Sequence, residues 1–403
     1  MWQKAGRARS HPGNTRSADR LAAGALESMR LIIVQPALPR YRVPVFDKLG
    51  KSRSVDLRIW FGTEVQQTFG FIDDPKSVPF AARRVRTRRF GPVLYHSAQT
   101  QAMKPGASDV VILPWDVRYA SLFLALCRGR RRGPRVLVWG HGSGRHDRRG
   151  GRLLRKYIAD RSDGIILYSD SAAKVWRSRG VLASKVHVAR NALDQEPIRR
   201  AREAWEVSPE SLERFAAARG TNGPVVLFCS RLTAGKGIEL LIESFAMVAR
   251  QLDDARLVII GAGPLRELLG NMVSALGLDP RVSFVGALYE EMDLAPWFLT
   301  ASVFAFPQRI GLSIFHAFGY GLPVVTSGDP LYRNPEYDAL VPGVNGLAFD
   351  GNDASAFSRA ILQLLTNPTL RQEMGEAAQR TVADGAYSLD NMVAGLLDAI
   401  QPR

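Results

Sequence analysis

The stretch Val225-Val-Leu-Phe-Cys-Ser-Arg-Leu-Thr-Ala-Gly-Lys-Gly237 joins an apolar run, a short polar loop and a glycine that opens a segment with helical apolar spacing. A short apolar run bounded by a turn is typical of a strand buried on both faces of its sheet. The same order of strand, glycine-containing turn and helix returns over residues 256–276. Strands that alternate with helices in this way predict a parallel sheet that helices cover on both faces.

This alternation extends over most of the chain and predicts two α/β units. We expect strands at 29–34, 55–61, 110–114, 136–139, 164–168 and 186–189, and again at 225–230, 256–260, 282–285, 303–306 and 323–326. The predicted organisation is a flexible tail (1–28), an N-terminal Rossmann-like domain (29–194), a polar linker with one helix (195–222), a C-terminal Rossmann-like domain (223–385) and a final helix (386–403). We expect that final helix to pack back on the N-terminal domain.

Charge is distributed unevenly along the 403 residues, whose formal net charge is +16. Residues 1–222 contain 42 Lys and Arg against 19 Asp and Glu, whereas residues 223–403 contain 12 against 19. Basic clusters at 83–89, 128–132 and 145–156 suit phosphate-rich partners such as an anionic membrane or a lipid diphosphate, although a merely solvated surface is the alternative. They lack the interleaved aromatic residues of a nucleic-acid interface, so we expect no nucleic-acid partner.

Cysteine usage and hydropathy indicate the compartment. Cys127 and Cys229 lie far apart in apolar runs and are interpreted as two buried thiols, with neither a disulfide framework nor a zinc spacing. No apolar stretch approaches the roughly 20 residues that span a bilayer, and residues 1–28 lack the apolar core of a secretory signal. We therefore expect a cytoplasmic protein, with peripheral contact to the inner face of the plasma membrane as a further possibility.

Two glycine-containing loops carry the first candidate site. Arg231 and Lys236 bracket the loop before the helix that starts at Gly237, so both cations can converge on a diphosphate beside that helix terminus. Two solvated loop cations are the alternative. Gly261-Ala-Gly263-Pro264 follows a strand and precedes a helix, where glycines permit close backbone approach, but an ordinary turn would have the same sequence.

Two histidines complete the candidates. In Pro307-Gln-Arg-Ile-Gly-Leu-Ser-Ile-Phe-His316 a glycine precedes a helix start, whose unpaired N–H groups at Leu312 and Ser313 could bind a phosphate. His316 lies on the same helix face as Leu312, and a satisfied core histidine is the alternative. His141 lies between glycines after the strand 136–139, at the strand end where parallel sheets bind ligands, and a structural histidine is the alternative there.

Together these motifs resemble glycosyltransferase family 4, a family of retaining enzymes with the GT-B fold of two facing Rossmann-like domains. The segments that carry the resemblance follow the family's order: Asn191-Ala-Leu-Asp194, Ser230-Arg-Leu232, Lys236-Gly237, Gly261-Ala-Gly-Pro264, Gly311-Leu312, Gly321-Leu-Pro-Val-Val325, Pro335-Glu336 and Gly343-Val-Asn-Gly346. Two features depart from the family. Gln308 and His316 stand where it has the two glutamates of a Glu-x7-Glu box, and residues 35–42 replace the glycine pair of its opening loop.

The resemblance implies an activity and a set of roles. A nucleoside diphosphate sugar would bind the C-terminal domain, and a glycan or polyprenyl-diphosphate-linked acceptor would bind the N-terminal one. The implied product is bacterial cell-surface polysaccharide, made by retaining hexosyl transfer without metal or cofactor. The implied catalytic residues are His141, Arg231 and Lys236, and the implied donor-binding residues are Gly263, Val285, Gln308, Gly311, Leu312, Ser313, His316 and Glu336. Gln308 would contact the donor sugar and His316 the ribose. A binding or scaffold protein of the same fold without activity is the alternative.

Overall fold

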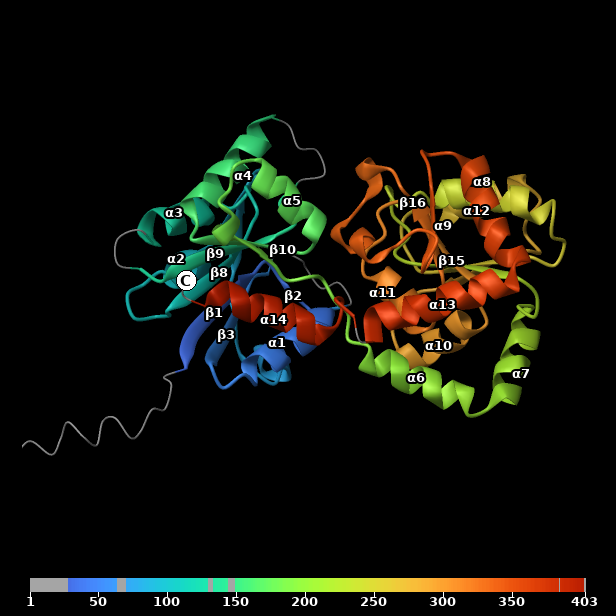
Figure 1. Ribbon diagram of the computed structural model, residues 1–403, viewed down its shortest axis with the longest axis horizontal. Helices are drawn as coiled ribbons and strands as arrows, with labels where there is room; N and C mark the ends of the chain where they lie inside the picture. Colours follow the sequence, from blue (N-terminus) through green and yellow to red (C-terminus); the bar gives the residue numbers. More distant parts are fainter. Residues whose placement is uncertain (1–27, 64–69, 130–132, 144–148, 384, 402–403) are drawn as a thin grey trace, which may run out of the picture.

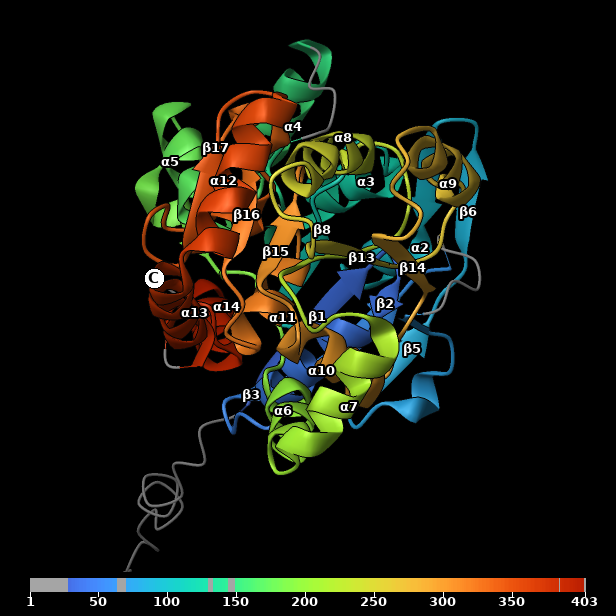
Figure 2. The ribbon, with the colours of Figure 1, turned by 90° about the vertical axis from the view of Figure 1, so that its right-hand side faces the viewer.

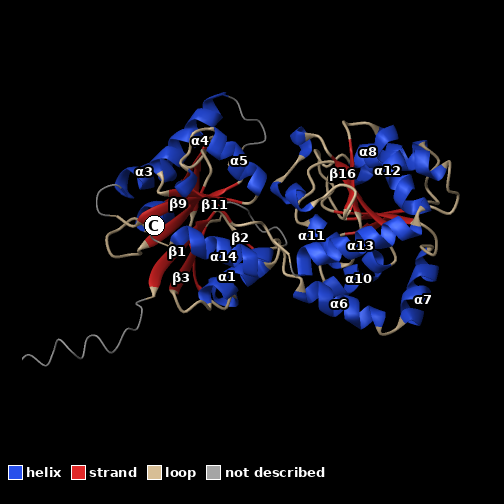
Figure 3. Cartoon of the chain, viewed as in Figure 1, coloured by secondary structure: helices blue, strands red, loops and turns tan. Residues whose placement is uncertain are grey.

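The computed structural model describes residues 28–63, 70–129, 133–143, 149–383 and 385–401. Two α/β lobes lie side by side, each with its strands inside and its helices outside (Figures 1 and 3). The predicted tail, apart from Ser28, lies outside the described residues. So do five arginines of the predicted basic clusters, which are Arg130, Arg131, Arg132, Arg145 and Arg148.

In the described part of the N-terminal lobe, seven strands form one parallel sheet in the order β11-β10-β9-β8-β1-β3-β5. Their bounds are β1 Met29–Gln35, β3 Val55–Phe61, β5 Ala81–Arg84, β8 Val110–Pro114, β9 Arg135–Gly140, β10 Gly164–Leu167 and β11 Val186–Val188. All five residues of β8 are buried, because both faces of this central strand are covered. The predicted strands of this domain are thus confirmed, and β5 is additional.

Two hydrophobic cores cover the two faces of this sheet. The first contains residues of α2 (Ser97–Gln101), α3 (Ala120–Gly129), α4 (Arg149–Arg161) and α5 (Asp170–Ser178). The second contains residues of α1 (Val43–Gly50) and of the C-terminal helix α14 (Leu389–Ile400). Met392, Leu396 and Ile400 of α14 pack into this second core, so the end of the chain returns to the N-terminal lobe (Figure 1).

The sequence did not predict the short elements between β3 and β8. They include the antiparallel pairs β2 (Leu38–Pro39) with β4 (Phe71–Ile72) and β6 (Thr87–Phe90) with β7 (Val93–His96), and the short 3-10 helices Arg40–Arg42 and Pro75–Ser77. The basic cluster 83–89 lies on β5 and β6, and its five arginines are exposed. Arg84 forms an ion pair with Asp73 at 3.3 Å, so this cluster is not wholly unpaired.

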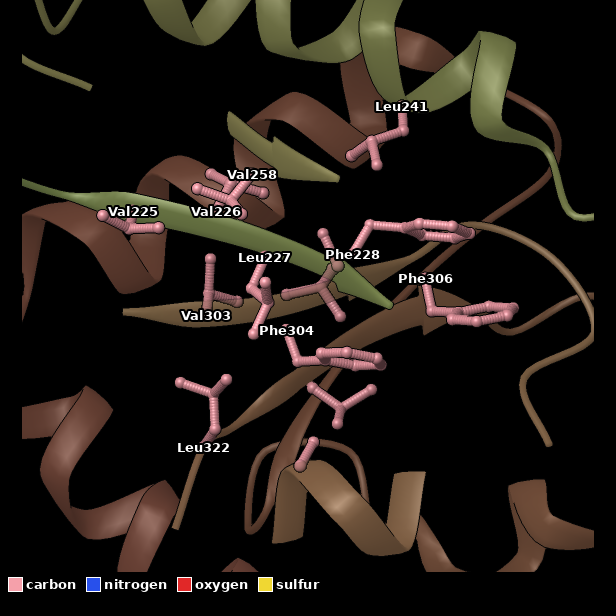
Figure 4. Close-up of a cluster of buried hydrophobic side chains, with 14 of the residues drawn as sticks. Val225, Val226, Leu227, Phe228, Leu241, Val258, Val303, Phe304, Phe306 and Leu322 are labelled. Carbon is pink, nitrogen blue, oxygen red and sulfur yellow. The ribbon is translucent and has the colours of Figure 1, made fainter. Parts of the chain in front are cut away.

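The C-terminal lobe contains a six-stranded parallel sheet within the described residues, in the order β14-β13-β12-β15-β16-β17. Its strands are β12 Val225–Cys229, β13 Arg256–Ile260, β14 Val282–Gly286, β15 Val303–Phe306, β16 Val324–Ser327 and β17 Gly346–Phe349. Its helices are α8 Ile238–Ala249, α9 Arg266–Ala275, α10 Glu291–Leu299, α11 Ser313–Gly319, α12 Ala354–Thr366 and α13 Pro368–Ala383 (Figure 2). Figure 4 shows the side chains of Phe228, Phe304 and Phe306 gathered with aliphatic neighbours in this lobe's core.

Residues 195–222 form two helices rather than a linker with one. These are α6 (Glu196–Glu206) and α7 (Pro209–Arg219), which pack against α10 of the C-terminal lobe. The indole N–H of Trp205 donates a hydrogen bond to the carbonyl of Met292 at 3.1 Å. This segment therefore belongs structurally to the C-terminal lobe, and α10, which the sequence did not predict, is the surface on which it packs.

The prediction of two buried thiols was wrong for Cys127, whose side chain on α3 is exposed. Cys229 at the end of β12 is half-buried. Burial, with a smaller effect from the nearby charge of Glu291, raises the pKa of the Cys229 thiol to about 12. Both are free cysteines.

Candidate functional site

Backbone hydrogen bonds join three loops at one edge of the C-terminal sheet. The N–H of Ser230 donates to the carbonyl of Ile260 at 3.0 Å, and that of Leu232 donates to Ala262 at 3.0 Å. The N–H of Gly261 donates to Gly286 at 2.7 Å. Because β12, β13 and β14 are parallel, the loops that follow them meet at the carboxyl edge, where open α/β sheets bind ligands.

Glycines permit this close approach. Gly261 has a φ of +147°, and a Cβ built on it would collide with the carbonyl oxygen of Ser230. A Cβ on Gly263 would collide with the backbone of Leu232. The Gly-Ala-Gly sequence is therefore more than an ordinary turn, because any side chain at these two positions would push the Arg231 loop away from the sheet.

The two loop cations lie at this same edge. Arg231 is exposed, and Lys236 is half-buried with its Nζ 5.1 Å from the centre of the Phe306 ring. Gly237, with a φ of +71°, lies against Pro307 and Gln308. The N–H of Gln308 donates to the carbonyl of Lys236 at 3.2 Å. The loop after β12 and the loop after β15 are thus neighbours, as a shared diphosphate site requires.

The loop after β15 holds Gln308, the first of the two residues that the sequence resemblance aligns with the glutamate box. The side-chain amide of Gln308 donates to Asn352 Oδ1 at 2.5 Å, and Gln308 lines a small cavity of about 280 Å³ with Gly235 and Gly237. Gly311 and Leu312 follow. Leu312 is the N-cap of α11, so this helix begins at Ser313, one residue later than the sequence predicted. Between Gln308 and Gly311 the backbone is fixed at Arg309, which has a left-handed φ of +56°. The carbonyl of Arg309 accepts a hydrogen bond from Asn334 Nδ2 at 2.9 Å.

His316 of α11 is hydrogen-bonded to a carboxylate that sequence reasoning missed. Its Nε2 lies 3.2 Å from Glu291 Oε2, and the Tyr320 hydroxyl donates to Glu291 Oε1 at 2.8 Å. Burial pushes the pKa of Glu291 up, but the hydrogen bonds and charge of His316, with the Tyr320 hydroxyl, outweigh it and hold that pKa below its usual range. Glu291 is the first residue of α10, and only that unpredicted helix brings it to His316.

A pocket of about 520 Å³ between the lobes brings several of these residues together. Leu312, Ser313 and His316 line it with Glu291, and Cys229 lies beside them. The N-terminal lobe contributes Arg40 and Tyr41 from the segment 35–42 and Pro44 from α1. The crossing between the lobes contributes Leu193, Asp194 and Pro197. Apolar residues of the C-terminal lobe form the remaining wall, which suits a flat, largely apolar ligand group.

His141 lies in a separate cluster on the N-terminal side. Its ring centre is 4.9 Å from that of Tyr168. Arg42, only 3% exposed, lies 5.0 Å from the centre of the same ring and 4.8 Å from that of Trp139. His141 is exposed at one side, and the protein around the rest of its ring desolvates it and lowers its pKa. Glu336 opposes this shift and the charge of Arg42 adds to it. Burial also raises the pKa of Tyr168 to about 12.

The remaining predicted residues divide between the two clusters. Glu336 is buried and accepts a hydrogen bond from Asn191 Nδ2 in the crossing between the lobes, so it helps to join the lobes. Its charge also acts on His141 and raises the pKa of that imidazole. A cavity of about 320 Å³ beside His141 is lined by residues of α5 and by the segment 330–338 of the C-terminal lobe. Val285 is half-buried in β14 and packs against the core, and it lines neither pocket between the lobes.

Two further properties bear on ligands. Among the residues that the structure describes, no three histidine, cysteine or carboxylate side chains gather closely enough to hold a metal ion. Within the same residues, no helix combines the length and the apolar composition that crossing a bilayer requires.

Comparison with known proteins identifies a family that the C-terminal lobe resembles. Residues 210–381 match the family model of the group 1 glycosyl transferases. The C-terminal lobe is thus similar to the group 1 glycosyl transferases. A stretch of 174 residues is 32% identical to a GDP-mannose-dependent alpha-(1-6)-phosphatidylinositol monomannoside mannosyltransferase of Mycolicibacterium smegmatis, and covers 40% of this chain and 44% of that relative. Another stretch of 193 residues is 29% identical to the lipopolysaccharide core biosynthesis glycosyltransferase LpsE of Rhizobium meliloti, and covers 47% of this chain and 53% of that relative. The chain thus matches about half the length of these group 1 relatives.

Solved structures extend the likeness to both lobes. Anabaena HepE, solved in complex with UDP, superposes with a TM-score of 0.71 at 15% identity, covering 92% of this chain and 99% of HepE. A Rickettsia africae glycosyltransferase superposes with a TM-score of 0.71 at 14% identity, covering 92% of this chain and 97% of that one. At such low identity these likenesses establish the fold, which is GT-B, as the sequence predicted.

Proposed function

We propose that this protein transfers a hexose-type sugar, with retention of configuration, from a nucleoside diphosphate sugar to a glycan or lipid-linked acceptor in cell-surface polysaccharide synthesis. One observation carries the proposal: Leu312, Ser313 and His316, which line the interlobe pocket, lie in the region that matches the group 1 glycosyl transferases. The relatives named as mannosyltransferase and as lipopolysaccharide core enzyme support a lipid or glycan acceptor. The solved complex of HepE with UDP supports a nucleoside diphosphate in the donor.

In this proposal the C-terminal lobe stabilises the departing diphosphate. Negative charge builds on that group as the glycosidic bond loosens, and groups aimed at developing charge contribute most to catalysis. Arg231 and Lys236 supply two cations at the carboxyl edge, and the N–H groups of Leu312 and Ser313 are the donors at the start of α11. No covalent nucleophile is assigned, because a front-face retaining transfer needs none.

The N-terminal lobe supplies His141. Its lowered pKa keeps the imidazole neutral near pH 7, so the ring can donate one hydrogen bond without adding a charge. We assign it to polarise the donor sugar or to donate toward the leaving phosphate. Gln308 is assigned to the donor sugar, through an amide that bonds to Asn352 in the free protein.

A melting screen followed by a turnover assay tests this function. Purified protein is heated with UDP, GDP, ADP and their sugars, and a ligand at about 100 times its Kd stabilises the fold by about 2.7 kcal/mol. Release of nucleoside diphosphate is then measured with added glycan and lipid-linked acceptors. Binding with turnover supports the transferase, and binding without turnover would favour the alternative of an inactive scaffold. No stabilisation by any nucleotide would contradict both.

Helix α4 supports a membrane surface as the place where the acceptor is met. Leu153, Leu154 and Tyr157 are 71%, 44% and 40% exposed on this helix, which also contains Arg152, Arg155, Lys156 and Arg161. Exposed apolar side chains among basic ones are typical of a helix that lies in the headgroup region of an anionic bilayer. Helix α4 contributes to the same hydrophobic core as α5, and α5 lines the cavity next to His141. We propose that the protein acts at the cytoplasmic face of the membrane.

Vesicle sedimentation tests this placement. Binding is expected to anionic vesicles, to fall as salt rises from about 0.05 to 0.5 M, and to be absent with neutral vesicles. Replacing Leu153 and Leu154 with serine should weaken binding to anionic vesicles at least about tenfold, because each serine buries less apolar area in the bilayer than the leucine it replaces. The control is Leu268→Ser in the C-terminal lobe, where the leucine is 52% exposed, between Leu153 and Leu154, and this variant should bind as the parent does. Equal partition onto both vesicle types would remove the anionic membrane from the proposal.

A further inference from the structure

Glu291 is a half-buried carboxylate that none of the sequence motifs explains. Its side chain is 18% exposed and that of its partner His316 is 27% exposed, and both line the pocket between the lobes. It comes from α10, an element outside the altered box, yet it lies one hydrogen bond from the box residue His316. The box has lost its carboxylates, whereas the pocket has kept one.

The contacts of Glu291 leave part of its acceptor capacity to the pocket. His316 Nε2 approaches Oε2 and the Tyr320 hydroxyl donates to Oε1, so each oxygen has one protein partner. An ionised carboxylate has about four acceptor sites, two on each oxygen. The carboxylate is therefore held at a fixed angle by two donors while one site on each oxygen stays open to a ligand.

Two adjacent acceptor oxygens suit one common chemical group. Vicinal hydroxyls present two donors at the spacing of a carboxylate's two oxygens, and charge-assisted hydrogen bonds of this kind are roughly twice as strong as neutral ones. In a nucleotide the vicinal diol is the ribose 2′,3′ pair. The apolar wall beside Glu291, which includes Leu288, Leu294 and Phe298, is where the flat base would lie.

We propose that Glu291 is the residue that binds the ribose diol of the donor nucleotide, and that His316 and Tyr320 are positioning residues that fix its carboxylate. This inference rests on the proposed function, because it assumes a nucleoside diphosphate in the pocket. It changes the role of His316, which the sequence assigned to the ribose directly. In this role the carboxylate comes from α10, and His316 of α11 holds it in place.

The test compares a nucleoside diphosphate with its 2′,3′-dideoxy analogue by calorimetric titration. UDP with dideoxy-UDP and GDP with dideoxy-GDP are the probes. In the parent protein, loss of the diol should weaken binding at least about tenfold. In Glu291→Gln the ribonucleotide should bind about as weakly as the dideoxy form, so that the ratio of the two falls to about one to three. The neighbouring Glu290→Gln, an exposed glutamate one residue earlier, is the control and should keep the parent's ratio.

The possible outcomes distinguish a failure of the role of Glu291 from a failure of the proposed transferase function. An undiminished ratio in Glu291→Gln, or a parent that binds both forms equally, would overturn the role of Glu291 and leave the transferase in place. A parent that binds neither UDP nor GDP would overturn the proposed function and this inference with it. If Glu291→Gln fails to fold, Glu291→Asp replaces it: the shortened carboxylate should lower the ratio at least about threefold, and an unchanged ratio would overturn the inference.

Discussion

The two lobes share a parallel-sheet construction but build their parts of the site by different means. In the C-terminal lobe the backbone does so: three loops are hydrogen-bonded to one another and glycines permit their contact. In the N-terminal lobe side chains do so, with Arg42 and His141 lying among aromatic rings. A site built from backbone depends on a few glycines at fixed places, whereas a site built from side chains depends on packing between segments distant in sequence.

The largest effect is expected where the C-terminal backbone is least tolerant. Gly261→Ala would add a Cβ at a φ of +147°, against the carbonyl of Ser230. Backbone strain and overpacking together should lower the free energy of unfolding by about 4 kcal/mol. Urea unfolding of parent and variant measures this difference.

The control for this variant is Gly277→Ala. Gly277 also has a positive φ, +68°, but a Cβ there would meet no atom within 4 Å. It should cost only about 1 kcal/mol, the strain of a left-handed residue alone. If the two variants lose the same free energy of unfolding, Gly261 is not required for the close contact between loops. The contrast between the two lobes would then be weaker.

The second effect concerns a buried side chain of the N-terminal lobe. His96 is fully buried, its Nε2 lies 3.3 Å from the carbonyl of Gln35, and burial lowers its pKa to about 4. Below pH 6.5 the unfolded chain binds a proton that the folded chain does not. Stability should therefore fall from pH 6.5 to pH 4, by about 3 kcal/mol from this residue.

The measurement is the pH slope of urea unfolding in the parent and in His96→Phe, which cannot titrate. The variant should be less stable at pH 7, because it loses a hydrogen bond, but its stability should fall less steeply toward pH 4. Parallel slopes would mean that His96 is protonated in the folded lobe, and that this buried network is not what makes the lobe sensitive to acid.

The lobes also differ in how far their sequence predicted them. Strands such as β3, β8, β13 and β15 were predicted with the bounds that the structure has. Runs of apolar residues form β8, β15 and all of β13 after Arg256, whereas β3 alternates apolar with polar residues. The stretch between β3 and β8 was not predicted, since its short antiparallel pairs have neither an apolar run nor a helical period. Helix α10 was missed because Pro296 lies inside it and its apolar residues face both the core and α6.

The same contrast applies to the candidate site. Arg231, Lys236, Leu312 and Ser313 could be found from sequence, because a strand, a loop and a helix start follow one another within a few residues. Arg42 and Glu291 could not, because each reaches the site through a contact with a residue far along the chain. The roles of all these residues stay predictions until they are measured.

A third prediction tests the cations of the backbone-built lobe. Arg231→Ala and Lys236→Ala should each weaken binding of a nucleoside diphosphate by about 2 kcal/mol, because each removes a charge-assisted hydrogen bond. Calorimetric titration at constant ionic strength measures it. Arg266→Ala, whose guanidinium stacks 3.8 Å from the centre of the Phe284 ring, is a control for charge near the same sheet edge. Unchanged affinity in both loop variants would leave Arg231 and Lys236 as solvated cations.

The smallest effect is expected for His316→Glu, for which the family pattern and the structure predict different nucleotide affinities. From the family pattern, His316→Glu would restore a box glutamate and bind nucleotide well. In the structure it would place a second carboxylate beside Glu291, where His316 Nε2 now lies 3.2 Å from Oε2. Two carboxylates at that distance cannot both stay ionised without cost, so one pKa rises and the pair loses its fixed geometry. We expect nucleotide affinity at pH 7.5 to fall about tenfold, which is about 1.4 kcal/mol.

The sign of the pH effect and a double variant make this last prediction specific. Acidification to pH 5.5 gives the carboxylate pair a shared proton, so the deficit of His316→Glu relative to the parent at the same pH should shrink. Adding Glu291→Gln removes the repulsion while leaving one carboxylate in the pocket, so the double variant should bind better at pH 7.5 than either single one. If His316→Glu alone binds as the parent does, the carboxylate of α10 has no part in nucleotide binding, and the box position would carry that role as the sequence first indicated.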